Sequence, residues 1–270
     1  MSDLAEAPAA AAPPKEPFGG IARLYGQTGL ARLQAAHVAV VGLGGVGSWT
    51  VEALARSGVG RLTLVDADEV CPSNLNRQLP ATTQTLGRGK ADVLAERAAQ
   101  INPAARVTVV PRFFNARTAE RIFAPGFDAV VDAIDDLPNK ALLLHEARQR
   151  GIFTVTSGAA GGKRDLTQIV VDDLVKAHHD PMLARLRKEL RTRYDWPRET
   201  RKRWDLPAVF SPEPPTFPTG DGEVCANRAE ASDDLALNCA SGYGTASFVT
   251  GAFGFALAQA VVGRLAGLGS

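Results

Sequence analysis

Cysteine is scarce in this chain, and its scarcity argues against two kinds of site. Three cysteines occur in 270 residues, Cys71, Cys225 and Cys239, and no two of them form a CxxC pair. Three cysteines are too few for a disulfide framework, and structural zinc sites are usually built from paired CxxC motifs. The sequence therefore predicts no zinc site and a reduced, cytoplasmic setting.

An excess of charge of one sign is also missing. The chain has 30 Lys and Arg against 29 Asp and Glu, a formal net charge of +1. No global electrostatic field therefore indicates nucleic acid or membrane, and any basic surface must be local. Apolar residues make up 45% and charged residues 22%, as in ordinary soluble globular proteins. The length suits one large domain, with or without an appendage.

Two segments could be targeting or membrane-spanning sequences by their composition, and each has features that argue against this. Residues 1–17 are rich in Ala and Pro and have no apolar core, which predicts a disordered tail rather than a signal or transit peptide. Residues 243–265 are mostly small and apolar, but Gln259 and Arg264 interrupt them. This composition favours a buried helix packed closely through small residues over a transmembrane helix, so we expect no membrane partner.

Apolar runs alternate with helical periodicity over the first part of the chain. Such alternation is typical of an α/β fold with a doubly wound, mostly parallel, Rossmann-like sheet. The expected strands are residues 38–41, 61–66, 107–110, 128–134 and 152–156, and the expected helices are 48–57, 90–101, 116–123 and 138–150.

The character of the chain changes after residue 157. We expect a strand at residues 166–171, a charged helix at 180–193 and an irregular segment at 194–233. The predicted organisation is a single domain over residues 18–270. Within it, residues 158–240 form an elaborated, substrate-facing appendage and residues 241–267 form a C-terminal helix.

A glycine-rich turn, with Gly42, Gly44, Gly45 and Gly47, separates the first expected strand from the first expected helix. Glycines let a phosphate approach the backbone, and the helix directs free N–H groups at that anion. Asp66 ends the second strand, where an acid accepts hydrogen bonds from ribose hydroxyls. These residues alone are compatible with a dehydrogenase, an ATP enzyme or a purely structural turn.

The residues that follow favour the ATP enzyme. A hydride-transfer enzyme does not cleave its pyrophosphate, whereas an adenylating enzyme must neutralise a triphosphate and a departing pyrophosphate. Arg77 and Lys90 supply positive charge, and Asn74 and Gln78 supply neutral hydrogen bonds.

Asp135 follows the fourth expected strand, at the sheet edge where a Mg²⁺ ligand is expected. Each of the three charged candidates also has an ordinary structural interpretation. Arg77 can be a surface residue, Lys90 a solvated lysine in a first helical turn, and Asp135 a helix N-cap before Pro138.

Taken in order, these residues resemble the ubiquitin-activating-enzyme-like adenylyltransferases, which include the bacterial enzymes of molybdopterin and thiamine biosynthesis. The matching stretches are Gly42-x-Gly44-Gly45-x-Gly47, Asp66-x-Asp68-x-Val70-x-x-Ser73-Asn74-x-x-Arg77-Gln78, Gly87-x-x-Lys90, Ile101-Asn102-Pro103 and Asp132-Ala133-Ile134-Asp135. The resemblance implies that these positions, Asp68 included, bind ATP and Mg²⁺ and activate a carboxylate as its acyl-adenylate.

Four further stretches resemble a narrower family, the tRNA threonylcarbamoyladenosine dehydratases. They are residues 18–26, residues 157–162 with Asp165-x-Thr167-Gln168-Ile169, Gly222-x-Val224-Cys225-Ala226, and residues 238–244. The resemblance implies a tRNA substrate whose threonylcarbamoyl carboxylate is activated by ATP and then cyclises with net loss of water. It also implies a homodimer, and it leaves open a monovalent cation and a sulfur-relay partner.

One departure from the wider superfamily is visible near the N-terminus. Pro17 and Gly20 stand where the sulfur-carrier activators place arginines, one of which reaches the ATP of the partner subunit. Arg23 is the candidate substitute.

Basic residues concentrate in residues 185–203, and aromatic residues interleave with them. Tyr194, Trp196 and Trp204 can stack on splayed RNA bases, or they can pack into the core beneath a solvated basic face. The nine basic residues are Arg185, Arg187, Lys188, Arg191, Arg193, Arg198, Arg201, Lys202 and Arg203.

Cys239 also has two interpretations. It is a candidate nucleophile that takes the acyl group from AMP, or a small buried residue at a helix start. We favour the structural role, because the cyclisation is intramolecular and needs no thioester.

Three other functions stay open beside the dehydratase. The main alternative is an adenylyltransferase that activates the C-terminal glycine of a sulfur-carrier or ubiquitin-like protein. The others are a nicotinamide-dependent oxidoreductase and a non-catalytic binding module that keeps ATP structurally.

Overall fold

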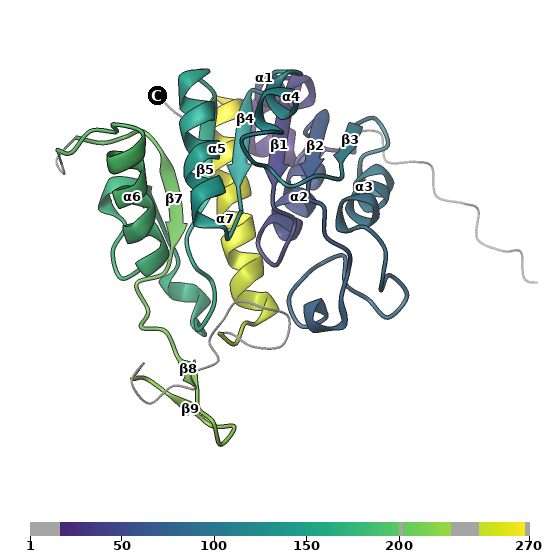
Figure 1. Cartoon of the computed structure of the whole chain (residues 1–270). Helices are drawn as coiled ribbons and strands as arrows, with labels where there is room; N and C mark the ends of the chain where they lie inside the picture. The colour runs from purple at the N-terminus through teal and green to yellow at the C-terminus, as the bar shows by residue number, and fades with distance from the viewer. Residues whose placement is uncertain (1–16, 200–201, 228–242, 268–270) are drawn as a thin grey trace, which may run out of the picture.

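A mostly parallel sheet of seven strands organises the protein (Figure 1). The computed structural model describes residues 17–199, 202–227 and 243–267. The strand order is β3-β2-β1-β4-β5-β7-β6, and every neighbouring pair is parallel except β6 with β7. The strands are β1 His37–Val41, β2 Arg61–Val65, β3 Arg106–Val110, β4 Ala129–Asp132, β5 Phe153–Ser157, β6 Val170–Asp173 and β7 Pro207–Phe210. The predicted doubly wound α/β fold is confirmed.

Helices cover both faces of this sheet. One face packs against α1 Gly19–Ala35, α2 Gly47–Arg56, α3 Lys90–Ile101 and α7 Ser247–Ala266. The other face packs against α4 Ala119–Phe123, α5 Leu137–Gln149 and α6 Pro181–Arg193. The inner strands β1 and β4 are buried at every residue, as parallel strands covered on both faces should be.

The C-terminal helix α7 is long and apolar enough to cross a membrane by length and composition. Half of its most apolar window is buried, against α1, α2 and β5. Gly254 shows how close the packing is, since a Cβ there would lie 2.6 Å from the carbonyl oxygen of Val46 on the entry to α2. The structure thus contains the closely packed core helix that the small residues predict.

Two predictions about elements need correction, and one helix was missed. The segment at residues 194–233 is not irregular throughout, because β7 lies within it and joins the main sheet beside β5. The strand expected at residues 166–171 begins at Val170, after a 3₁₀ turn at Leu166–Gln168. Helix α1 was not predicted at all. The boundary drawn at residue 158 stays a prediction, but the sheet extends across it.

A two-stranded ribbon, β8 Phe217–Pro218 with β9 Val224–Cys225, stands apart from the sheet. Figure 1 shows it projecting at the end of the molecule where α7 begins. The predicted tail falls almost wholly outside the described residues, as do Arg201 and Cys239.

Candidate active site at the carboxyl ends of β1, β2 and β4

The sheet reverses its strand order between β1 and β4, which are hydrogen-bonded neighbours. Ligands of doubly wound folds bind at the carboxyl ends of the strands at such a switch point. The glycine turn follows β1 here, and Ala133 follows β4 beside it. The Ala133 N–H donates to the Val41 carbonyl at 2.9 Å. The two chain segments predicted to hold ATP and Mg²⁺ therefore start side by side.

Three glycines of the turn differ in what a side chain at their positions would meet. Gly42 has a φ of +88°, and a Cβ there would lie 2.6 Å from the Ala133 carbonyl oxygen. A Cβ on Gly47 would overlap the Gly42 carbonyl oxygen. Gly44 differs from both, because the Gln78 amide nitrogen, 3.9 Å away, is the nearest atom that a Cβ would meet. The backbone at Gly44 therefore leaves space for a ligand to approach.

Asp66 supports the turn from the end of β2. Its carboxylate accepts the Leu43 N–H at 2.6 Å and the Asp68 N–H at 2.8 Å. Burial raises the pKa of Asp66, and the two N–H donors and the nearby Lys90 charge oppose that rise. A carboxylate has about four acceptor positions, so two remain for ribose hydroxyls.

Lys90 is not the solvated lysine that its place in the first turn of α3 allows. Its side chain is 7% exposed, and its ammonium group lies 2.9 Å from a carboxylate oxygen of Asp68, whose side chain is half exposed. A cation at a helix N-terminus opposes the helix dipole, and burial adds a desolvation cost. The ion pair with Asp68 offsets part of this cost, and a role for Lys90 in binding ATP stays a prediction.

Arg77 is half-buried rather than a free surface residue. Its guanidinium donates to the Ser73 carbonyl at 2.6 Å, and its Cγ lies 3.3 Å from the position of a Cβ on Gly45. Trp49 of α2 donates to the Arg77 carbonyl at 3.0 Å. The stem of Arg77 is thus held against the glycine turn.

Asn74 and Gln78 are both buried, but they do different things. The Asn74 side-chain oxygen accepts the Cys71 N–H at 3.0 Å and so closes the 3₁₀ turn Pro72–Asn74. The Gln78 side-chain oxygen is buried and, among the described residues, has no hydrogen-bond partner. An unpaired buried amide oxygen beside Gly44 is a polar group that a nucleotide can satisfy.

Asp135 is exposed after β4 and does not cap the following helix. The N-cap of α5 is Asp136, whose carboxylate accepts the Asn139 N–H at 3.0 Å. The helix-cap interpretation of Asp135 is therefore wrong, and its role as a Mg²⁺ ligand stays a prediction. No group of three or more metal-ligating side chains occurs among the described residues.

Sequence reasoning missed a buried ion pair beneath Asp135. Lys140 of α5 and Asp132 of β4 are both fully buried, with 2.9 Å between ammonium and carboxylate. Asp132 also accepts the Thr156 hydroxyl at 2.6 Å and the Ile134 N–H at 3.1 Å, while Lys140 donates to the Ile134 carbonyl at 3.0 Å. The pair fixes the backbone that carries Asp135. No local pattern signals it, because the two partners lie on separate elements.

Two motifs of the narrower resemblance meet in space. The Gly162 N–H donates to the Gly244 carbonyl at 2.8 Å, and a Cβ on Gly161 would lie 2.9 Å from the Cβ of Tyr243. The small-residue loop after β5 is thus pinned to the segment that enters α7.

The aromatic residues of the basic segment at residues 185–204 are packed inside the protein. Trp196 and Trp204 are each 5% exposed and pack edge to face, so the predicted stacking on RNA bases is wrong for both. Tyr194 is half-buried and stacks on His145. Within residues 185–203, the described basic residues that are exposed are Arg185, Lys188, Arg193, Arg198, Lys202 and Arg203.

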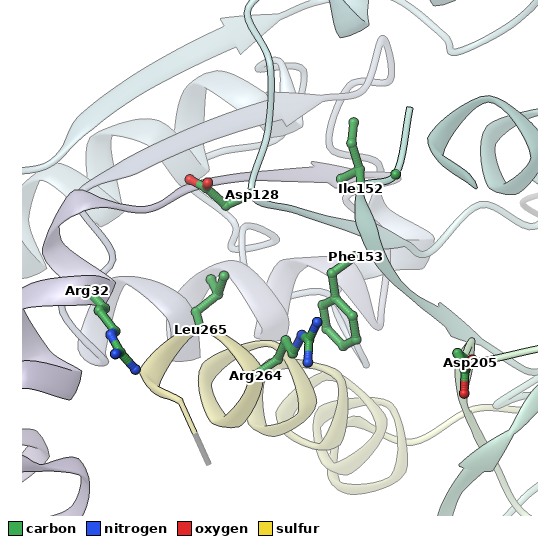
Figure 2. Close-up of a pocket in the computed structure, with 8 residues that line it drawn as sticks. Arg32, Asp128, Ile152, Phe153, Asp205, Arg264 and Leu265 are labelled. Carbon is green, nitrogen blue, oxygen red and sulfur yellow. The ribbon is translucent and has the colours of Figure 1, made fainter. Parts of the chain in front are cut away.

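A cleft of about 590 Å³ lies at the opposite, amino ends of β4 and β5 (Figure 2). Figure 2 shows Arg264 of α7 directed at the Phe153 ring, and its guanidinium lies 5.6 Å from the ring centroid. None of the predicted site residues lines this cleft. Arg23 lies exposed on α1, and a role toward a partner's ATP stays a prediction.

Comparison with known proteins identifies the family of this chain. The model of the ThiF family matches residues 20–269. The tRNA threonylcarbamoyladenosine dehydratase of Escherichia coli is 45% identical over 241 residues, covering 89% of this chain and 90% of that protein. The Haemophilus influenzae protein of the same name is 43% identical over 248 residues, 92% of each chain.

Solved structures extend the likeness to three dimensions. The E. coli dehydratase in complex with ATP superimposes with a TM-score of 0.80 at 40% identity, covering 92% of this chain and 93% of that chain. Its complex with AMP gives a TM-score of 0.81 with the same identity and coverage. The chain belongs to the ThiF family and, within it, to the tRNA threonylcarbamoyladenosine dehydratases.

Proposed function

We propose that this protein uses ATP to adenylate the threonylcarbamoyladenosine carboxylate in tRNA and drives its cyclisation with net loss of water. The observation that carries the proposal is the buried Lys90, held by Asp68 beside the glycine turn. The names of the relatives, and the ATP and AMP complexes of the E. coli enzyme, support the same chemistry.

The residues around the turn fit an adenine nucleotide. The phosphates lie over Gly44 and the N-terminus of α2, where the backbone is open. Asp66 accepts the ribose hydroxyls, and the unpaired Gln78 oxygen accepts from a donor of the nucleotide. Asn74 acts by holding the 3₁₀ turn that presents Arg77.

The first step joins the two substrates. A carboxylate oxygen of the threonylcarbamoyl group attacks the α-phosphorus of ATP, and the bond to the bridging oxygen of pyrophosphate breaks. Charge develops on the departing pyrophosphate, and Arg77 and Lys90 stabilise it. Lys90 suits this role because its burial places the ammonium group in a low dielectric environment.

Asp135 would hold a Mg²⁺ ion, which neutralises phosphate charge when bound. The exposed Asp135 carboxylate fits a hard cation that keeps several waters and takes one protein carboxylate plus phosphate oxygens. Lys140 and Asp132 position Asp135 through the Ile134 backbone. A monovalent cation is a separate proposal, which rests on the resemblance alone.

The second step closes the ring. A nitrogen of the same modified nucleoside attacks the activated carbonyl carbon, AMP leaves with the carboxylate oxygen, and the nitrogen loses its proton. The net change in the nucleoside is the loss of one water. Because attack is intramolecular, no enzyme thioester is required, and we assign Cys239 a structural role.

The exposed cations of α6, together with Arg198, Lys202 and Arg203, supply salt-sensitive contact to tRNA phosphates. Their contribution is charge alone, since Trp196 and Trp204 are core residues. We further propose a cytoplasmic homodimer in which Arg23 approaches the partner's nucleotide, and we leave a sulfur-relay partner as a separate proposal.

One alternative has a specific observation in its favour. The Thermus thermophilus sulfur carrier protein adenylyltransferase is 41% identical over 118 residues, although these cover 44% of this chain. ATP–pyrophosphate exchange separates the two functions. We expect exchange that depends on threonylcarbamoylated tRNA, whereas exchange stimulated by a carrier protein and indifferent to tRNA supports the alternative.

A further inference from the structure

A second cleft, of about 510 Å³, lies along the edge strand β3, away from the glycine turn. Four exposed arginines line it: Arg61 at the start of β2, Arg106 at the start of β3, Arg112 just after β3, and Arg121 on α4. No acidic residue is among its lining residues. The protein's near-zero net charge thus hides a locally basic surface.

The four arginines have no side-chain partner within the described parts of the chain, unlike Arg97 and Arg150, which pair with Glu52 and Glu120. Arg61 and Arg106 are register partners on adjacent strands. Like charges side by side across strands are unfavourable. Four exposed arginines along one cleft, with no carboxylate among its lining residues, favour an anionic ligand.

The charges of Arg61 and Arg106 also act on His37, a buried residue that lines the cleft. His37 is the register neighbour of Arg61 on β1, and its Nε2 lies 2.9 Å from the Thr63 hydroxyl. Burial lowers the pKa of His37, and the charges of Arg61 and Arg106 lower it further, against Asp128. Charge and hydroxyl groups therefore face the same space.

The chemistry of the lining selects phosphate rather than base or nucleoside. Besides arginines the cleft presents the exposed Thr108, and no carboxylate that could accept ribose hydroxyls is among its lining residues. His37, its one aromatic ring, is 8% exposed and packs against Phe127, so it offers no stacking platform. Arginine and threonine side chains are typical contacts to nucleic-acid phosphates.

The length and direction of the cleft suit a polyanion. The five residues of β3 extend over about 13 Å, at roughly 3.3 Å per residue, which spans several phosphates of one strand. The far end of β3 adjoins the nucleotide site, because the Asp66 N–H donates to the Val110 carbonyl at 3.3 Å. A strand of RNA in the cleft would therefore lead toward the site of adenylation.

We propose that this arginine cleft binds the sugar-phosphate backbone of the tRNA substrate and so fixes the tRNA while its modified base reacts. The inference rests on the proposed function. It adds a contact surface on β2, β3 and α4, at the opposite edge of the sheet from β6 and β7.

The test compares alanine substitutions inside and just outside the cleft. Arg106→Ala and Arg112→Ala are measured singly and together. Arg117→Ala is the matched control, because Arg117 is exposed, lies two residues before the start of α4 and does not line the cleft. Two quantities are measured: the Kd for threonylcarbamoylated tRNA and the Kd for ATP. The Kd for tRNA is measured from about 0.05 to about 0.3 M salt, so that its dependence on released counterions can be determined.

Each lost phosphate contact should make the negative slope of log K against log salt shallower by about 0.9, which corresponds to a roughly fivefold weaker Kd at about 0.15 M salt. We expect about that change for each single variant and roughly 30-fold for the pair. Arg106→Lys should retain most of the affinity, Arg117→Ala should match the parent, and ATP binding should be unchanged in all.

Three outcomes decide between explanations. An unchanged Kd and salt slope for tRNA in the double variant overturn the cleft while leaving the proposed function intact. Weaker binding of inorganic tripolyphosphate with unchanged tRNA affinity overturns it too, in favour of a site for free oligophosphate. Cleft-dependent tRNA binding without any dehydration by the parent supports the cleft and counts against the proposed function.

Discussion

Replacing Lys140 with methionine tests whether the buried ion pair beneath Asp135 is needed. Lys140 and Asp132 are both fully buried, and their charged groups are 2.9 Å apart. Methionine keeps the unbranched stem of lysine and removes the charge. Asp132 then keeps the Thr156 hydroxyl and the Ile134 N–H, but it loses its counter-ion.

Removing one partner of a buried pair costs about 3–5 kcal/mol, because the other charge is left uncompensated. A chain of this size loses about 2–4 °C in Tm per kcal/mol, so the expected fall in Tm is roughly 6–20 °C. The double variant Asp132→Asn/Lys140→Met removes both charges of this pair, and we expect it to be more stable than Lys140→Met alone.

The pH dependence of the single variant has a defined sign. Burial already raises the pKa of Asp132, and the Lys140 charge is the largest influence that lowers it. Lys140→Met therefore raises that pKa further. A carboxyl whose pKa is higher in the folded than in the unfolded protein binds protons more tightly when folded, so stability decreases as pH rises through the folded-state pKa. We expect the stability deficit of Lys140→Met to shrink as pH is lowered.

Urea unfolding of the parent, the single variant and the double variant, each at two pH values, measures all three effects. The reasoning is refuted if Lys140→Met unfolds within about 1 kcal/mol of the parent, below the range for breaking a buried pair. It is also refuted if the double variant is the less stable of the two. A deficit that grows at low pH would contradict the sign of the linkage.

Three further predictions follow from the site. Arg77→Ala and Lys90→Ala should each cut turnover about 100-fold or more in a single-turnover assay while tRNA binding persists; near-parental rates would remove both from the mechanism. Gly42→Ala should weaken ATP binding and lower Tm, since its Cβ meets the Ala133 carbonyl at 2.6 Å in a left-handed backbone, and parental values in calorimetry would contradict the clash. Cys239→Ser should dehydrate tRNA at a rate within about threefold of the parent, whereas loss of activity comparable to removing a nucleophile would show that the thiol reacts.

The alternation of strands and helices was enough to predict the sheet, because buried parallel strands leave continuous apolar runs such as residues 38–41 and 129–131. β7 escaped prediction because four residues, Pro207–Phe210, lie among prolines and charges, and their strand character depends on pairing with β5 and β6. Helix α1 contains Gly19, Gly20, Gly26 and Gly29, which lower its intrinsic propensity, and its packing against α7 overrides that local preference.

The nucleotide site was predictable in part. Gly42 and Asp66 occupy positions set by strand ends, which the sequence shows directly. The burial of Lys90 depends on Asp68 and on the isolated bridge between Glu69 and Gly89, neither of which a local pattern reveals. Trp196 and Trp204 look like exposed aromatics in a basic segment, and only the tertiary packing of α5, α6 and β7 places them in the core.

Mass spectrometry of the nucleosides in threonylcarbamoylated tRNA, after incubation with this protein and ATP, tests the central claim most directly. We expect the threonylcarbamoyladenosine to lose the mass of one water as AMP accumulates, and Lys90→Ala to abolish both changes. An unchanged nucleoside mass, with ATP and the intact modified tRNA present, would contradict the assignment of this site to the dehydration of tRNA.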